Sequence, residues 1–422
     1  MLGTLVALAA LHNGLSPDLL IFALTYIGLA LGSIPYTHLD RSSIALLGAV
    51  AVLAFHRLSF QQAMQSVDFS TLVLLGSLMV ISAQLRLAGF YAWVVCRVVG
   101  IARRPWTLLA MIVFAAAVLS ALFANDVVVL IFTPVLIGAL RGAKKDPVPY
   151  LMALATGSNI GSAATLIGNP QNMLIGQAGE LSFWHYTAFI APLVAGCLVL
   201  NVLAVALIYH RRIFVTDHSQ QPSLPPEPAV VWSLVGKTLA IMAALLVAMV
   251  AGPWLHISRP VAAMAAAGLV LISRKTRPRD LFALVDWNLI LLFVGLFIVI
   301  ADAEQHQLLK PALHALAQAG VNLQHHAPLA GATLVLSNIV SNVPAVLLLK
   351  PAIALHATSS WYLLAVVSTF AGNLTLLGSI ANLIVAEQSE PLNVRLGYSE
   401  YLKVGLPLAI ITTLLAVLYI KL

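Results

Sequence analysis

Apolar stretches of membrane-spanning length follow one another along almost the whole chain, separated only by short polar connections. A helix needs about 20 apolar residues to cross roughly 30 Å of hydrocarbon. Hydrophobic residues fill 61% and charged residues 9% of the 422 positions, whereas a soluble domain carries about 25% charged residues. The lipid bilayer is therefore the expected partner of this chain, and the fold is predicted to be an all-α polytopic membrane protein.

Two apolar stretches, 105–140 and 328–352, are predicted to fold back on themselves as re-entrant hairpins. Their longer arms could also reach across the membrane at about 1.5 Å per residue, but each pair returns to its starting side either way. The ten predicted full crossings are 17–36, 42–58, 69–85, 150–177, 183–209, 232–252, 259–273, 284–303, 361–387 and 402–420.

The basic residues divide unequally between the two sides of this span map. Of the 22 Lys and Arg residues, 17 fall on one side and five on the other. The positive-inside rule makes the first side cytoplasmic. We therefore predict a multi-pass protein of the cell inner membrane with both termini in the periplasm. Because these loops account for the net charge of +7, no nucleic-acid partner is expected.

The two halves of the chain match at a nearly constant offset, with one small gap near residues 160–166. The offset is 218 at the first matches, 217 in the middle and 215 near the end; examples are Asp68 with Asp286, Asn125 with Asn342, and Tyr186 with Tyr401. Each half holds five crossings, an odd number, so the second copy is predicted to enter the membrane upside down. Inverted repeats are typical of secondary transporters, whose binding site lies where the copies meet.

Four segments carry polar residues where an ordinary span would be apolar: LFANDVVVLIFTP (122–134), TGSNIGSAATLIGNPQN (156–172), LSNIVSNVPAVLLLKP (336–351) and TFAGNLTLLGSIAN (369–382). Gly and Pro break helices, and freed backbone groups are tolerated only beside protein or a wet cavity. Asn, Ser and Thr add neutral ligands, while helix N-termini favour an anion. Close packing of spans is the alternative, but four segments paired by a repeat favour a binding site.

The substrate- and ion-binding residues predicted from these segments are Asn125, Asp126, Ser158, Asn159, Thr165, Asn169, Asn172, Ser341, Asn342, Asn373, Thr375, Ser379 and Asn382. No catalytic residue is predicted. The segments contain no Lys or Arg except Lys350, at the far end of the third. A charged anion would therefore depend on helix N-termini and a co-bound cation.

Asp126 is the one acid within the four segments, and its repeat mate is Val343. A carboxylate within the membrane costs roughly 2.5 kcal/mol or more and marks a functional site, although it could instead cap a helix from a wet surface. Asp126 could carry a proton, or bind Na⁺ together with Asn125 and Asn342. Asp302, in contrast, ends a span and is expected to face water.

These segments resemble the ion transporter superfamily with citrate-transporter-like domains, which includes the arsenite-permease and NhaD-type antiporter branch and the divalent anion/sodium symporters. GSNIGSAATLIGNPQN is similar to an SNIGGTATLIGDPPN-type segment of that group, and FANDVVVLIFTP and SNVPAVLLLKP resemble the two hairpins of the arsenite-permease branch. The resemblance implies hairpin tips near Asn125 and Asn342 and two broken helices. It also implies a homodimer whose transport domains slide like elevators against fixed scaffold domains.

The hairpin tips depart from part of that family. Its sodium-coupled anion symporters carry Ser-Asn-Thr at both tips, whereas this chain has Ala-Asn-Asp at 124–126 and Ser-Asn-Val at 341–343. This difference argues against sodium coupling by the same route.

The repeat and the resemblance together divide the chain into five predicted parts. Residues 1–100 are the scaffold part of the first repeat, and 101–209 are its transport part, with a hairpin, a broken helix and a span. Residues 210–229 are a polar, Pro-rich cytoplasmic linker. Residues 230–325 and 326–422 are the scaffold and transport parts of the second repeat.

The expected function is secondary active transport of a small anion or oxyanion, such as a carboxylate or an arsenite-like species, coupled to H⁺ or Na⁺. A Na⁺/H⁺ antiporter that uses Asp126 is the alternative, and a channel is a more remote one. The chain shows neither a nucleophile–base set nor an H-E-x-x-H motif. We therefore expect no enzyme and no cofactor besides the coupling ion.

Overall fold

Every regular element in the computed structural model, which describes residues 16–32, 37–102, 104–214, 229–311, 318 and 321–421, is a helix. The all-α prediction is confirmed for this part of the chain. The predicted linker 210–229 lies mostly outside the described residues. In the first half the helices are α2 (Pro17–Leu31), α3 (Arg41–Ala54), α4 (Phe60–Ser66), α5 (Phe69–Leu87), α6 (Phe90–Ile101), α7 (Pro105–Leu122), α8 (Asn125–Gly142), α9 (Val148–Ser162), α10 (Pro170–Ala178), α11 (Phe183–Ile208) and α12 (His210–Phe214).

The second half follows a similar order. Its helices are α13 (Trp232–Leu255), α14 (Arg259–Leu271), α15 (Pro278–Phe282), α16 (Trp287–Gln305), α18 (His326–Val340), α19 (Asn342–Leu349), α20 (Thr358–Ala371), α21 (Ile380–Ser389) and α22 (Tyr398–Lys421), with short 3-10 turns η1 (Lys350–Ala352), η2 (Leu376–Gly378) and η3 (Glu390–Leu392). α5 and α16 begin 218 residues apart, in agreement with the offset found in the sequence.

Seven described helices are long and apolar enough to cross a membrane, namely α5, α7, α8, α11, α13, α16 and α22. Three further predicted crossings, α2, α3 and α14, are apolar but only 13 to 15 residues long. The stretches 150–177 and 361–387 are each interrupted, as α9–α10 and α20–α21. One helix, α6, lies in a connection where no span was predicted, although it is apolar and 12 residues long.

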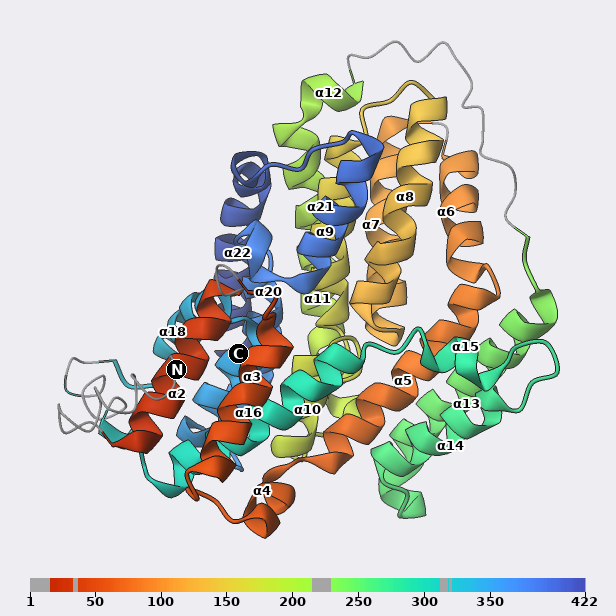
Figure 1. The fold of residues 1–422 in the computed structure, drawn as a ribbon. Coiled ribbons are helices and arrows are strands. Elements are labelled where there is room, and N and C mark those ends of the chain that lie inside the picture. Colours follow the sequence, from red (N-terminus) through yellow and green to blue (C-terminus); the bar gives the residue numbers. More distant parts are fainter. Residues whose placement is uncertain are drawn as a thin grey trace.

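The contacts between helices stay the same when each helix is replaced by the corresponding helix of the other half. α3 packs on α16, as α14 packs on α5, and α7 packs on α9, as α18 packs on α20. α9 contacts its own mate α20, and α11 contacts α22. In Figure 1, α5 and α16 run obliquely, whereas α7, α8 and α9 stand upright. This exchange is expected for two related copies around a two-fold axis, while their opposite insertion in the membrane stays a prediction.

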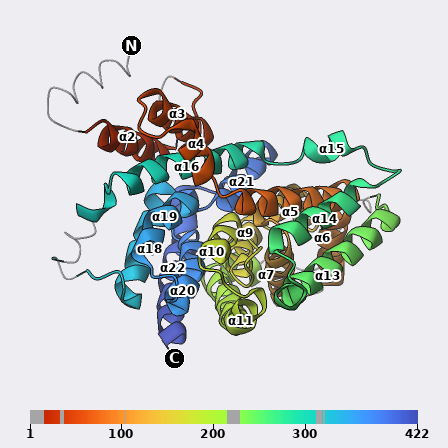
Figure 2. The ribbon, with the colours of Figure 1, turned by 90° about the horizontal axis from the view of Figure 1, so that it is seen from below.

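The broken helices lie at the centre of the molecule. All 15 residues of α9 are buried, and so are the residues of α20 from Ser360 to Ala371. Seen from below in Figure 2, α9 and α10 lie between the helices of the second hairpin and those around α7. Because these helices are surrounded by protein, their broken backbone is kept away from lipid, as a break within the membrane requires.

Candidate transport site

The same arrangement of side-chain amides satisfies the backbone at both helix breaks, which lie between α9 and α10 and between α20 and α21. Asn172 and Asn382 each donate from Nδ2 to two carbonyls that their own break releases. The acceptors are the carbonyls of Ser162 and Thr165, at 3.5 and 3.1 Å, and of Gly372 and Thr375, at 2.7 and 3.2 Å. A buried carbonyl without a partner costs about 1–3 kcal/mol, so these two amides make the breaks tolerable.

These matched positions are 210 residues apart, not 215 to 217. The single gap predicted near 160–166 does not account for this, because the offset is 210 at Ser162 but 215 again at Tyr186 and Tyr401. The hairpin tips Asn125 and Asn342 still differ by 217, so the register changes between the tips and the breaks. In this segment of the second copy, α19 has eight residues, whereas the corresponding helix of the first copy, α8, has 18. The second copy is therefore shorter here.

Each break also accepts a hydrogen bond from the other repeat. Thr369 Oγ1 donates to Asn172 Oδ1 at 3.3 Å, and Asn159 Nδ2 donates to Asn382 Oδ1 at 2.9 Å. Thr369 and Asn159 are themselves 210 residues apart. Each copy therefore donates one hydrogen bond to the asparagine at the helix break of the other copy.

Asn159 is the centre of this amide network. Its Nδ2 donates to the Oδ1 atoms of Asn373 and Asn382, each at 2.9 Å. Its Oδ1 accepts from Ser379 Oγ at 3.0 Å and from Asn125 Nδ2 at 3.4 Å. The side chain is 2% exposed. One buried amide thus joins the first hairpin tip to both broken helices.

The second hairpin tip has an unusual backbone. Ser341 has φ +76° and ψ 161°, a region that essentially only glycine enters and that costs about 1–3 kcal/mol for other residues. The next residue, Asn342, begins α19, and its Oδ1 is buried without a hydrogen-bond partner in the described part of the chain. A Cβ placed on Gly372 would lie 3.4 Å from Asn342 Nδ2, so this tip lies against the second break.

Four helix N-termini meet this network. They are those of α8 at Asn125, α10 behind its N-cap Asn169, α19 at Asn342 and α21 behind its N-cap Ser379. α21 packs on α8 and α9, while α10 packs on α19 and α20. Each N-terminus carries a partial positive charge. Within the described residues, no Lys or Arg donates to the network's amides, so backbone and amide groups are what a cargo would meet.

The structure places the remaining predicted residues at or beside this network. Asn169 Nδ2 donates to Thr369 Oγ1 at 3.0 Å. Ser158 shares a hydrogen bond of 2.8 Å with Ser120 of α7, and Thr165 donates to the Ala121 carbonyl, so both fix the hairpin to the first break. Thr375 Oγ1 donates to Asn338 Oδ1 at 3.0 Å, which does the same in the second copy.

Asp126 stands apart from these contacts. It is half-buried in the first turn of α8, next to Asn125, and makes no hydrogen bond or ion pair to a described residue. Three residues that the sequence analysis does not predict also belong to the network, namely Ser162, Asn338 and Thr369. All three lie inside the four polar segments, and an offset of 210 would have identified Thr369 as the mate of Asn159.

A separate charged cluster lies where α2, α3 and α16 meet. One ligand atom from each of Asp18, Asp302 and His306 lies within 4.8 Å of the others. Arg57 contacts both carboxylate oxygens of Asp18, with Nη2 at 2.7 Å from Oδ2. The guanidinium therefore supplies the positive charge that a metal ion would bring. Asp302 is 1% exposed, which corrects the expectation that it faces water, because α2 and α3 pack over this end of α16.

Buried amides satisfy a pair of helix breaks, and seven of the described helices are long and apolar enough to cross a membrane. This combination is typical of a membrane transporter. Comparison with known proteins identifies the group. Residues 19–371 match the citrate transporter family, and the chain belongs to that family. This result confirms the resemblance that the broken-helix and hairpin motifs indicate.

Relatives match over nearly the whole chain. The 46 kDa membrane protein of Mycobacterium leprae is 27% identical, covering 95% of this chain and 98% of its own length. The silicon efflux transporter LSI3 of rice, Oryza sativa subsp. japonica, is 28% identical, covering 85% and 87%. The solved YdaH transporter of Alcanivorax borkumensis has a similar fold, with a TM-score of 0.58, 14% identity and coverage of 96% and 97%.

Proposed function

We propose that this protein is a secondary active transporter that moves a small anion or oxyanion across the inner membrane, coupled to H⁺ or Na⁺. The observation that carries the proposal is the Asn159-centred network, which joins both helix breaks and the first hairpin tip through buried amides. Four helix N-termini around it favour negative charge. The amides can also donate to and accept from hydroxyl groups.

Two kinds of cargo fit these groups. The family description names citrate, a carboxylate whose oxygens would accept from amides and helix N-termini. The name of the rice relative gives silicon as what it exports. Oxyacids of silicon and arsenic are small hydroxylated molecules with little charge, which suits a network without cationic side chains. We therefore propose carboxylates and oxyanions as the substrate class.

The packing supports an elevator mechanism. The network lies entirely in the predicted transport parts, 101–209 and 326–422, whereas α3, α5, α14 and α16 of the predicted scaffold parts pack on one another across the repeats. A transport body could therefore move with its site intact. We further propose a homodimer held by the scaffold parts, with both termini in the periplasm.

The test is gradient-driven uptake of radiolabelled citrate and arsenite into proteoliposomes, with pH and sodium gradients imposed separately. Asn159→Ala leaves four buried polar partners without their bonds, each worth about 1–3 kcal/mol. We expect uptake to fall by roughly a hundredfold or more. Asn288→Ala, an exposed asparagine on α16, is the matched control and should transport normally. Wild-type uptake by Asn159→Ala would exclude the network as the transport site.

Na⁺/H⁺ exchange through Asp126 is the second candidate, because this half-buried acid lies beside Asn125 without a partner among the described residues. Asp126→Asn keeps the shape but removes the charge. If Asp126 couples anion movement to a gradient, the variant should lose gradient-driven uptake but keep anion exchange. If Asp126 exchanges Na⁺ for H⁺ directly, sodium-driven proton movement without any anion should disappear. The exposed Asp280→Asn is the control, and unchanged coupling in Asp126→Asn would remove Asp126 from the mechanism.

A further inference from the structure

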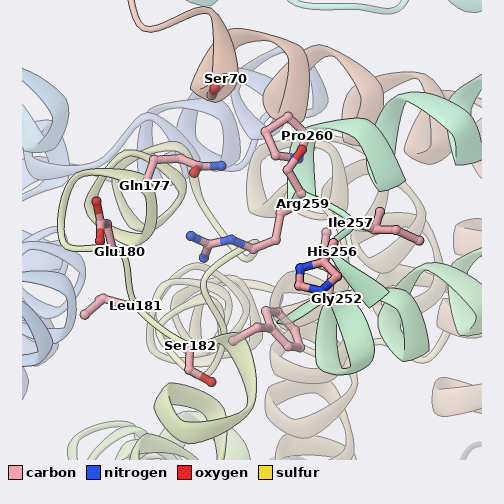
Figure 3. Close-up of a pocket in the computed structure, with 13 residues that line it drawn as sticks. Ser70, Gln177, Glu180, Leu181, Ser182, Gly252, His256, Ile257, Arg259 and Pro260 are labelled. Carbon is pink, nitrogen blue, oxygen red and sulfur yellow. The ribbon is translucent and has the colours of Figure 1, made fainter. Parts of the chain in front are cut away.

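A polar cavity lies outside the amide network, between the end of α10 and the start of α14 (Figure 3). Its volume is about 520 Å³, within the range of roughly 300–1,000 Å³ that small-molecule sites occupy. Gln177, Glu180 and Ser182 line it from the predicted transport part, and Ser258 and Arg259 from the predicted scaffold part. The charge bias of the loops puts this end of the molecule on the periplasmic side.

Arg259 is the cationic group of this cavity. Its Nη2 donates to the carbonyl of Gly176, near the end of α10, at 2.6 Å. That is its one hydrogen bond within the described part of the chain, although a guanidinium offers five N–H donors in a planar fork. No described carboxylate lies within ion-pair distance of it, even though Glu180 lines the same cavity. Most of its donor capacity therefore remains available.

Gln177 adds a neutral donor to the same space. Its Nε2 is buried and has no hydrogen-bond partner among the described residues. Figure 3 shows the Gln177 amide and the Arg259 guanidinium directed toward the same region of the cavity. A buried donor without an acceptor costs about 1–3 kcal/mol, which an acceptor entering the cavity would relieve. A planar guanidinium beside an unpaired amide is complementary to a carboxylate or another oxyanion.

We propose that this cavity is an anion-binding vestibule, in which Arg259 and Gln177 take a small carboxylate or oxyanion from the periplasmic side. The proposal rests on the proposed function for its substrate class. It adds a site outside the amide network. Glu180, an exposed acid at this cavity, opposes the bound charge and keeps the affinity moderate, so that the anion can move on.

Binding in the vestibule has a consequence for motion. The Arg259–Gly176 hydrogen bond joins the predicted scaffold part to the predicted transport part. An anion held by the guanidinium competes with the Gly176 carbonyl for the N–H donors of Arg259. Loading the vestibule thereby weakens one link between the two parts that an elevator would need to separate.

The first experiment measures binding of citrate and of inorganic phosphate to the full-length protein in nanodiscs by isothermal titration calorimetry. Arg259→Gln keeps a donor for the Gly176 carbonyl but removes the charge, and should weaken binding at this site roughly tenfold or more. Glu180→Gln should tighten it. Arg279→Gln removes an exposed charge in α15 and serves as the control for net charge. Equal affinity in Arg259→Gln and wild type, or no binding of either anion by wild type, would overturn the proposal.

The second experiment separates the vestibule from the transport site. Asn159→Ala should lose transport but keep the Arg259-dependent binding, whereas Arg259→Gln should raise the external half-saturating concentration for uptake. If wild type transports neither anion yet binds one through Arg259, the proposed function fails while the vestibule stands. If wild type transports the anion and Arg259→Gln shows unchanged binding and unchanged half-saturation, the vestibule alone fails.

Discussion

The two hairpins differ much more than the two helix breaks beside them. α7 and α8 have 18 residues each, and the backbone at their turn is ordinary, with φ −56° at Ala124. α18 and α19 have 15 and eight residues, and their turn holds Ser341 at φ +76°. The breaks, in contrast, share the same Asn-to-carbonyl bonds at a fixed offset of 210.

The difference shows that the helix breaks and the hairpin tips are under different structural constraints. The breaks need the same solution in both copies, because each releases backbone groups that lipid cannot satisfy. The tips are free of that constraint and have diverged in charge, with Asp126 in one copy and Val343 in the other. We therefore infer that the breaks build the site, while the tips give the two halves of the transport cycle different properties.

The largest effect expected from this comparison is at the two closing amides. Asn172→Ala and Asn382→Ala each leave two buried carbonyls without a donor, so each should lower the free energy of unfolding by about 2–6 kcal/mol, at about 1–3 kcal/mol for each carbonyl. The two losses should be similar, because each amide donates to the same two positions of its break. Chemical unfolding in detergent measures both, with Asn288→Ala as a control that should stay near wild type. A loss in only one variant would show that the breaks are not equivalent.

A smaller effect of opposite sign is expected at the hairpin tips. Ser341→Gly relieves a backbone conformation that costs about 1–3 kcal/mol, partly offset by the greater freedom of glycine in the unfolded chain. We expect a net stabilisation of about 1 kcal/mol. Ala124→Gly, at the matching tip, has no strain to relieve and should destabilise by about 0.5–1 kcal/mol. The melting temperatures of the two variants test this prediction. A shift of the melting temperature in the same direction for both variants would contradict the difference in backbone strain between the tips.

The smallest effect expected is the difference in stability loss between two matching helix caps in the predicted scaffold parts. Asp68 accepts from the Thr71 amide at 3.1 Å, and Asp286 accepts from the Leu289 amide at 3.0 Å. Replacement of either Asp by Ala should cost about 1 kcal/mol. Asp68 also accepts from the Thr71 hydroxyl at 2.5 Å, so its loss should be slightly the larger. Thermal unfolding of the two variants tests this order, and a Thr71→Val variant should reduce the difference between them.

The sequence by itself determined the membrane-spanning helical class and the four polar segments, and it predicted the two copies. Apolar length, Gly and Pro breaks, and clusters of Asn are properties of consecutive residues, so they can be read without knowing the fold. Asn125, Asn159, Asn172, Asn373 and Asn382 were all predicted in this way, and the structure brings them to the two breaks.

The tertiary structure alone decided which groups meet. The contact of Asn159 with Asn382 joins positions 223 residues apart, and the vestibule depends on Arg259 reaching Gly176, 83 residues away. Asp302 became buried because α2 and α3 cover the end of α16. The match of Asn159 with Thr369, two unlike residues, emerged only from their hydrogen bonds to the two breaks. A local pattern gives the chemistry that a segment offers, whereas only packing brings distant segments close enough to supply each donor with its acceptor.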